Sequence, residues 1–141
     1  AGGQRMMKAA KAAINELNAS TQLIAVTVLT SMTDKDVAST GVVRSLTEQV
    51  TALALLAKES GLEGVVCSAQ EAKQLRHDFG ESFTLVTPGI RPASAAGDDQ
   101  RRTLTARQAL DQGSHYLVIG RPITQSPHPL VALESLIDEL Q

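Results

Sequence analysis

The chain has 141 residues, a formal net charge of -2, 43% hydrophobic residues and 20% charged residues. This is the composition of a globular protein with one core, and it excludes disordered and fibrous classes. The near-neutral charge and a total of two Phe and one Tyr leave neither a basic footprint nor stacking platforms for nucleic acid. The lone Cys67 excludes a disulfide framework and favours a cytoplasmic setting. No apolar run approaches the ~20 residues of a membrane span, so no membrane partner is expected.

The first half of the chain alternates helical and strand patterns. Apolar residues recur at helical spacing over residues 4–17, and a continuous β-branched run over residues 23–29 predicts a buried strand. The stretch from Ser45 to Glu48 has the capping-box pattern and opens a helix that Gly61 ends. Residues 64–67 then predict a short second strand.

The second half repeats this order. A second capping box, from Ser68 to Glu71, opens a helix, and residues 84–87 predict a third strand. A polar loop over residues 91–102 precedes a short helix capped at Thr105. Residues 116–120 predict a fourth strand, buried on both faces. Pro129 starts a last helix, for which we expect a buried stripe of Leu130, Leu133, Ile137 and Leu140.

The order is therefore one helix followed by four βα units, which implies parallel strands with right-handed crossovers. Two architectures fit: an open doubly wound sheet, or part of a (β/α)8 barrel. Four units are half of eight, and a whole barrel has ~250 residues. Gly2-Gly3 before a helix is typical of the end of a βα loop, so we expect a strand to be missing before it. The truncated barrel is the favoured interpretation, with residues 1–141 as one domain.

The carboxyl ends of parallel strands are where α/β proteins bind ligands. The expected strand ends supply hydroxyls, backbone amides and guanidinium groups, and none of these is an obvious general acid or base. We expect Cys67 to be a small buried residue rather than a nucleophile, because no base pairs with it in the sequence. In chain order the strand ends carry Thr30, Ser31, Thr33, Cys67, Ser68, Thr87, Pro88, Gly89, Arg91, Gly120 and Arg121.

Gly120-Arg121 is suited to an anion, and the pair favours a phosphate. Glycine lets a ligand approach the backbone closely, and arginine offers a two-pronged hydrogen-bonding fork. The alternative is a strand that ends in a surface salt bridge. For Arg91, a ligand role and a solvated loop cation remain equally open. The loop over residues 93–102 is either a ligand-gating lid or simply mobile.

At these residues the chain resembles the orotidine 5′-phosphate decarboxylase family, in its bacterial branch. Five ordered stretches carry the resemblance, over essentially all 141 residues: residues 28–32, 64–68, 87–92, 97–102 and 119–124. The resemblance implies a (β/α)8 TIM barrel of which this chain supplies about the C-terminal half. It also implies a cytoplasmic homodimer that uses no metal or organic cofactor.

The resemblance also implies roles for individual residues in binding orotidine 5′-phosphate or UMP. Arg121 and the Gly120 amide would hold the 5′-phosphate, with Arg91 close by. Gln100 would bridge the phosphate and the pyrimidine. Thr30, with Thr33 as a second candidate, would hydrogen-bond near the pyrimidine, and Pro88 would line the base pocket.

One departure from the family pattern is large. The alternating Asp and Lys residues that would carry out the decarboxylation, in an Asp-x-Lys-x-x-Asp pattern, do not occur in this sequence. We therefore expect no catalytic residue in this chain, whose role would be phosphate and pyrimidine binding. Two alternatives remain: another phosphate-binding barrel enzyme that acts on a sugar phosphate, and a non-catalytic binding fragment.

Overall fold

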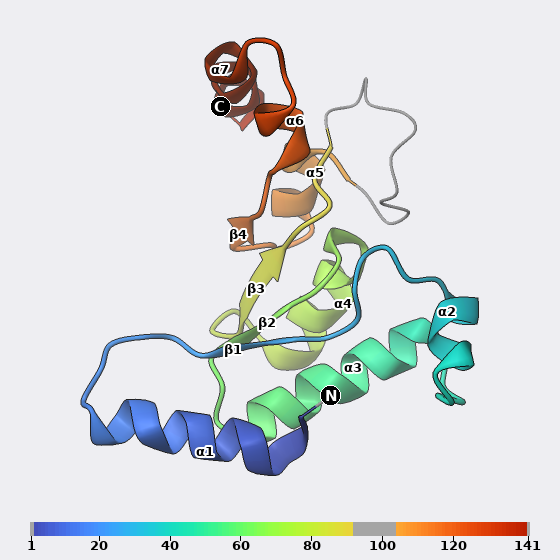
Figure 1. Cartoon of the computed structure of the whole chain (residues 1–141), viewed down its shortest axis with the longest axis vertical. Helices are drawn as coiled ribbons and strands as arrows, with labels where there is room; N and C mark the ends of the chain where they lie inside the picture. The colour runs from blue at the N-terminus through green and yellow to red at the C-terminus, as the bar shows by residue number, and fades with distance from the viewer. Residues whose placement is uncertain (1, 92–103, 141) are drawn as a thin grey trace.

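The computed structural model describes residues 2–91 and 104–140. Figure 1 shows the strands at the centre of the molecule, with α1 and α3 at one end and α5, α6 and α7 at the other. In chain order the elements are α1 (Gly3–Glu16), β1 (Ile24–Val26), α2 (Asp34–Ser39), α3 (Leu46–Glu59), β2 (Gly64–Val66), α4 (Ala69–Phe79), β3 (Thr84–Thr87), α5 (Ala106–Asp111), β4 (Tyr116–Leu117), α6 (Arg121–Thr124) and α7 (Pro129–Leu140).

The strands form one parallel sheet in the order β1-β2-β3-β4, as the alternating pattern predicts. The register places Val26, Val66, Val86 and Tyr116 in one row across the sheet. At the start of β2 the strands lie so close that a Cβ on Gly64 would be 2.1 Å from the Thr84 carbonyl oxygen. Glycine is therefore required at this position by the packing of the sheet.

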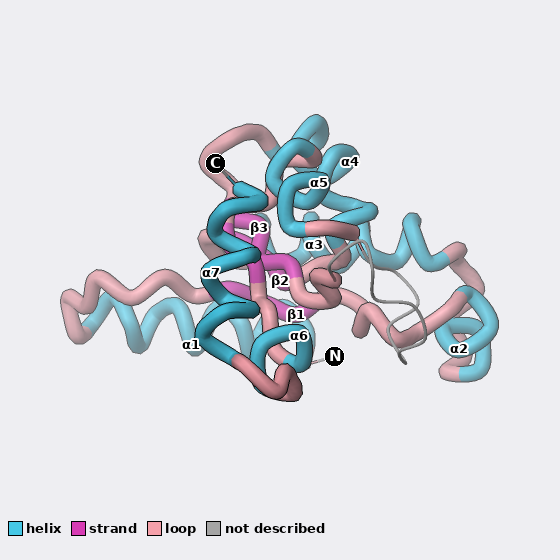
Figure 2. The backbone as a smooth tube through the Cα atoms, turned by 90° about the horizontal axis from the view of Figure 1, so that it is seen from above, coloured by secondary structure: helices cyan, strands magenta, loops and turns pink. Residues whose placement is uncertain are grey.

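Helices cover one face of this sheet. Figure 2 shows α3, α4 and α5 gathered on one side of the strands. On that side Val65 and Leu85 are fully buried. They belong to the larger apolar cluster, called here the first core, which also holds Val50, Ala54 and Leu75.

A smaller apolar cluster, called here the second core, lies where β4, α5, α6 and α7 meet. Its buried members are Ala69, Ile90, Ala106, Ala109 and Leu136, and packed against them are the partly buried Leu104, Leu117, Ile119, Ile123 and Leu140. The two cores divide the molecule along the sheet: the first supports β1 to β3, and the second supports the end of the chain.

The three helix starts predicted from capping boxes are confirmed. Ser45, Ser68 and Thr105 each precede a helix, and in each the side chain three residues later bonds back to the cap backbone amide. Those return bonds measure 2.9 Å, 2.9 Å and 3.0 Å. Such a cap stabilises a helix by ~1 kcal/mol from local sequence alone, which is why this prediction does not depend on the rest of the fold.

The extents predicted for three strands are wrong. β2 covers Gly64–Val66 rather than residues 64–67. β1 covers Ile24–Val26 rather than residues 23–29, because its partner β2 ends at Val66. β4 covers only Tyr116–Leu117. Nor is this strand buried on both faces: Tyr116 is 60% exposed and Val118 is 51% exposed. β4 is an edge strand, and no layer of the described residues covers this face.

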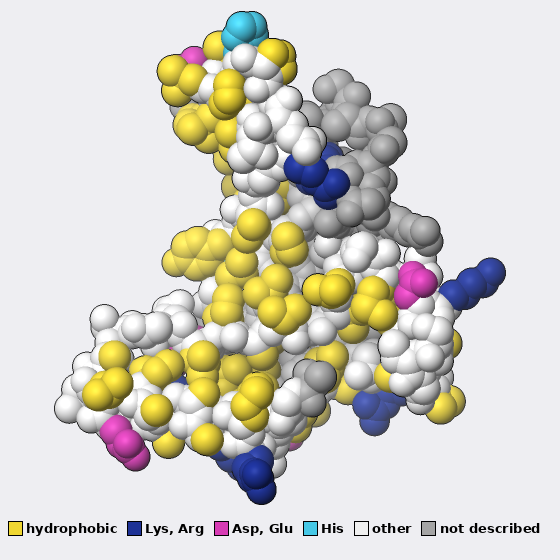
Figure 3. Space-filling model, in the orientation of Figure 1, with side chains coloured by type: hydrophobic (Ala, Val, Ile, Leu, Met, Phe, Trp, Pro, Cys, Tyr) yellow, Lys and Arg dark blue, Asp and Glu magenta, His cyan; other side chains and the backbone are white. Residues whose placement is uncertain are grey.

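The stripe expected on the last helix is confirmed only at Leu140, which packs against the second core. Leu130, Leu133 and Ile137 are exposed, and the buried residue is Leu136. Within the described residues α7 packs mainly against α5 and α6, and Leu130, Leu133 and Ile137 stay at the surface. Figure 3 shows hydrophobic side chains at the surface over α7, and over α1 and the strands.

Two short helices, α2 and α6, were not predicted. α2 begins at a capping box formed by Thr33 and Asp36, in which aspartate stands where glutamate or glutamine is usual. α6 has only four residues and no side-chain cap. No helix of the described residues has the length and apolar character needed to cross a bilayer.

Candidate functional site

Because the strands are parallel, all their carboxyl ends lie at one edge of the sheet, and a cavity of about 250 Å³ opens there. Two of the predicted binding residues, Thr30 and Pro88, line it together. They follow β1 and β3, so the cavity spans the end of β2 between them. Its other lining residues are Val26, Val28, Leu29, Ser31, Val66 and Cys67.

This cavity is apolar on most sides and carries a few hydroxyls. Thr30 is only 6% exposed, so its hydroxyl is held inside the protein. Cys67 is buried, as expected. Thr33, the second candidate, caps α2 instead: its hydroxyl donates to the Asp36 carboxylate at 2.7 Å. An apolar pocket with few, fixed polar groups suits a flat heterocycle with carbonyl and amide edges.

Arg91 lies at the end of β3 and is also buried, with 9% of its surface exposed. One guanidinium nitrogen, Nη1, donates to the carbonyl oxygen of Ile90 at 2.8 Å. Its backbone N–H donates to the carbonyl oxygen of Leu104 at 3.0 Å, beside a parallel bridge between Ile90 and Leu104. Arg91 is therefore fixed in the fold and is not a solvated loop cation.

Gly120 and Arg121 follow β4. Gly120 is exposed with a φ of -107°, and a Cβ built on it would meet nothing within 4 Å. The described residues thus leave open space beside the Gly120 backbone, where a ligand can approach. Arg121 is the first residue of α6 and is half-buried.

The remaining predicted residue, Gln100, lies outside the described residues, as does most of the loop over residues 91–102. The structure therefore brings Thr30 and Pro88 into one cavity and places Arg91, Gly120 and Arg121 after the neighbouring strands at the same edge. Sequence reasoning missed Val66 and the Ile90–Leu104 bridge. Val66 could have been identified from the strand register, which aligns it with Val26 and Val86.

None of the five lysines lines this cavity. Lys11 is bonded to Glu63, and Lys58 donates to the Phe79 carbonyl oxygen at 3.0 Å and lies over the Phe79 ring. Lys8, Lys35 and Lys73 are exposed on helices. Among the described residues no group of three or more His, Cys, Asp and Glu side chains is placed to hold a metal ion.

Three carboxylates of residues 2–91 have a lowered pKa, and all three lie outside the cavity. The hydrogen bonds from the Ser45 hydroxyl and amide lower the pKa of Glu48, and those from Gln74 and His77 lower the pKa of Asp78. Partial burial raises the pKa of Glu63, but the hydrogen bonds from Lys11 and the Leu23 amide outweigh it, so this pKa also lies below its usual value. These carboxylates cap helices or tie elements together, and none is placed to act as an acid or base in the cavity.

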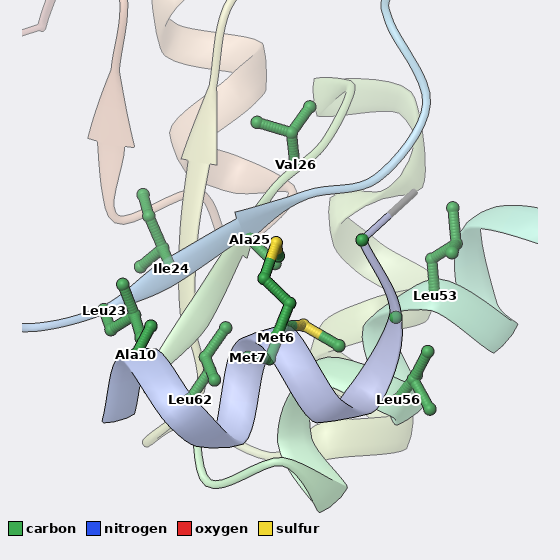
Figure 4. A pocket seen from close by; sticks show the side chains of 12 residues that line it. Met6, Met7, Ala10, Leu23, Ile24, Ala25, Val26, Leu53, Leu56 and Leu62 are labelled. Atoms are coloured by element: carbon green, nitrogen blue, oxygen red, sulfur yellow. The ribbon is translucent and has the colours of Figure 1, made fainter. Parts of the chain in front are cut away.

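A second cavity, of about 360 Å³, lies between α1 and β1 (Figure 4). The side chains of Met6, Met7, Ile24 and Leu56 help to line it, and no lining residue carries a charged or hydrogen-bonding side chain. It has no group that could orient a polar ligand or take part in chemistry. The edge with Thr30, Pro88 and the two arginines is therefore the better candidate site.

Comparisons with known proteins identify the family and the fold of this chain. The sequence model of the family described as "Orotidine 5'-phosphate decarboxylase / HUMPS family" matches residues 1–136. The chain is 52% identical over 139 residues to the orotidine 5'-phosphate decarboxylase of Saccharophagus degradans, and 51% identical over 140 residues to that of Hahella chejuensis. Each alignment covers 99% of this chain.

The crystal structure of orotidine 5'-phosphate decarboxylase from Lactobacillus acidophilus matches with a TM-score of 0.81 and 37% identity, over 99% of this chain and 60% of that one. The enzyme from Pyrococcus horikoshii, at 18% identity and a TM-score of 0.56, shares the fold over 97% of this chain and 68% of its own. These matches confirm the predicted fold: four parallel strands with flanking helices, about half of a (β/α)8 TIM barrel.

This chain spans 58% of the Saccharophagus relative and 60% of the Hahella relative, in their C-terminal part. The motif order predicted from the sequence, the parallel sheet and the family match agree with one another. The chain belongs to the orotidine 5'-phosphate decarboxylase / HUMPS family.

Proposed function

We propose that this chain forms the phosphate- and pyrimidine-binding part of an orotidine 5′-phosphate decarboxylase. The whole enzyme would convert orotidine 5′-phosphate to UMP in pyrimidine biosynthesis, in the cytoplasm and as a homodimer. Residues 1–141 would be the C-terminal part of a single barrel domain. The observation that carries the proposal is the cavity that Thr30 and Pro88 share at the carboxyl edge of the sheet, next to the ends of β3 and β4 that carry the arginines.

Each predicted residue has a role in this proposal. The Arg121 guanidinium and the Gly120 amide hold the 5′-phosphate, and the buried Arg91 adds positive charge beside it. Thr30 hydrogen-bonds to the pyrimidine edge, and Pro88 lines the base pocket. Gln100 bridges the phosphate and the pyrimidine.

These residues bind and orient the substrate but do not break its bond. Loss of CO2 from C6 of the pyrimidine leaves an electron pair on that carbon, which must then take up a proton. Among the residues that the structure describes, no Lys, Asp or Glu side chain lines the cavity to stabilise that charge or donate that proton. The part described here supplies binding energy from the phosphate, remote from the reacting carbon, and holds the ring in register.

The proposal is tested by UMP binding to the complete protein and to its Arg121→Ala variant. A charged hydrogen-bonded pair is worth ~1.5–3 kcal/mol, so we expect UMP affinity to fall about 10- to 100-fold. Uridine lacks the phosphate, and its affinity should not change. Arg107→Ala is the matched control, because Arg107 is an exposed arginine on α5, ion-paired to Asp111 at 3.4 Å. Unchanged UMP affinity in Arg121→Ala at low salt would refute the phosphate assignment.

The sugar-phosphate alternative would keep the anion site but act on a different substrate. The relatives matched above are named orotidine 5'-phosphate decarboxylase, which does not favour it. Turnover of a pentose phosphate by the complete protein, without turnover of orotidine 5′-phosphate, would reverse this preference.

A further inference from the structure

Two apolar residues, one on each side in the chain, flank the candidate anion site. Ile119 and Ile123 lie immediately before and shortly after Gly120-Arg121, and both are half-buried against the second core. The Ile123 backbone N–H also donates to the Gly120 carbonyl oxygen at 2.9 Å, which closes the turn that begins α6. Gly120 and Arg121 are thus held on both sides by contacts with one apolar cluster.

The same cluster holds the other arginine. Ile90, which is fully buried, and Leu104 both belong to the second core, and the Leu104 carbonyl accepts the backbone N–H of Arg91 at 3.0 Å. The backbones of Arg91 and Arg121, which follow different strands, are therefore fixed to a common apolar support.

α6 cannot hold its own shape. It has four residues, and a single helical turn is unstable in isolation because nucleation costs more than one turn of hydrogen bonds returns. No side chain caps it. α6 packs against α7, and within α6 it is Ile123 that lies against the second core.

From this arrangement we infer that Ile123 is a positioning residue for the anion site: its packing against the second core holds Gly120 and Arg121 in the geometry that grips a phosphate. The inference rests on the proposed function. Ile123 would not touch the ligand. It would act through α6, so its loss should weaken the grip on the phosphate without changing how the pyrimidine is held by Thr30 and Pro88 on β1 and β3.

The test compares two ligands on the complete protein, UMP and uridine, which differ only in the phosphate. Ile123→Ala should lower UMP affinity about 10-fold, the low end of the about 10- to 100-fold expected when the Arg121 contact is removed, and leave uridine affinity within about twofold. Ile123→Val keeps most of the contact with the second core, so its UMP affinity should be close to that of the native protein. This variant also tests the inference if Ile123→Ala folds poorly. An equal loss for both ligands would overturn the inference, because it would indicate general destabilisation.

Val50→Ala is the control for destabilisation. Val50 is 1% exposed in the first core and is remote from α6 in the chain, so this variant should lose stability without a selective loss of UMP. The inference would also be overturned if Val50→Ala lowered UMP affinity, relative to uridine affinity, as much as Ile123→Ala does.

A double-mutant cycle separates this inference from the proposed function. If Ile123 acts through Arg121, Ile123→Ala should cost much less UMP affinity in the Arg121→Ala background than in the native protein. If the two substitutions lower UMP affinity by fully additive free energies, the proposed role of Ile123 is wrong. The phosphate assignment still stands in that case, provided that Arg121→Ala alone weakens UMP binding. If Arg121→Ala alone has no effect, the proposed function fails and the inference fails with it.

Discussion

The two edges of the same sheet are built in opposite ways. At the amino edge, side chains tie neighbouring strands together: Glu63 accepts from the Leu23 amide at 2.8 Å, and Arg76 and His115 link the starts of β3 and β4. At the carboxyl edge there is a cavity of about 250 Å³ and a glycine with open space beside it. The comparison teaches that the stabilising side-chain bonds described above gather at one edge, whereas the ligand binding that we propose would use the other.

Arg76 is the centre of the amino edge. Its Nη1 donates to the carbonyl oxygens of Gly80, Glu81 and Phe83 at 2.9, 3.0 and 3.1 Å. Its Nη2 donates to the Gly113 carbonyl oxygen and lies 2.8 Å from Nδ1 of His115, which also accepts the Leu85 amide at 3.1 Å. One guanidinium thus joins the end of α4 to the loops that lead into β3 and β4. It contrasts with Arg91 and Arg121, which we propose serve a ligand.

The largest effect should come from a methyl group added at the amino edge. Gly64→Ala places a Cβ 2.1 Å from the Thr84 carbonyl oxygen, which is rigid backbone, so β2 and β3 must separate. We expect a loss of about 3 kcal/mol in the free energy of unfolding, measured with urea on the complete protein.

Its matched control is the same change at the carboxyl edge. Gly120→Ala meets nothing within 4 Å, so it should leave the free energy of unfolding nearly unchanged and instead weaken UMP binding. If both glycine variants unfold equally easily, the division between the two edges is wrong.

A somewhat smaller effect is expected at Arg76. Arg76→Ala leaves several carbonyl groups without their donor, and we expect it to lower the free energy of unfolding by about 2–3 kcal/mol. The folded Arg76→Ala protein should bind UMP with unchanged affinity. Arg121→Ala should instead lose UMP affinity and keep its free energy of unfolding. The measurement is urea unfolding together with UMP titration, with Arg107→Ala as the exposed-arginine control. A selective loss of UMP affinity in Arg76→Ala would break the comparison.

The smallest effect should be at Glu63, and it should depend on pH. Its pKa lies below the usual 4.5: partial burial raises it, and the bonds from Lys11 and the Leu23 amide lower it by more. A carboxylate with a lowered folded-state pKa stabilises the protein fully above its ordinary pKa, and this contribution is lost as the pH falls through the folded-state value.

Glu63→Gln should therefore cost about 1 kcal/mol at pH 7, as expected for a partly exposed ion pair. The difference from the native protein should shrink as the pH falls below about 4.5. Unfolding measured over this range checks it, with the exposed Glu59→Gln as the control. A difference that stays constant with pH would show that the carboxylate charge at Glu63 contributes nothing.

The features that sequence predicted best are those that short segments decide for themselves. The capping boxes at Ser45, Ser68 and Thr105 form within four residues, and each starts a helix where predicted. Thr84–Thr87 is the strand that was predicted to the residue. In the candidate site, the rule that parallel strands share a carboxyl edge was sufficient to place Thr30 and Pro88 together.

The sequence by itself thus determined the order of the four strands and of every helix except α2 and α6, the parallel arrangement of the strands and the edge that carries the candidate site, because caps, apolar periodicity and glycines act locally. It did not determine which faces are buried. Tyr116, Val118, Leu130 and Ile137 have the sequence pattern of core residues and are exposed, because burial depends on what packs against a face. Only the tertiary structure revealed that Ile90 and Leu104 share one apolar cluster with Ile119 and Ile123, since the two pairs lie apart in the chain and come together through the fold.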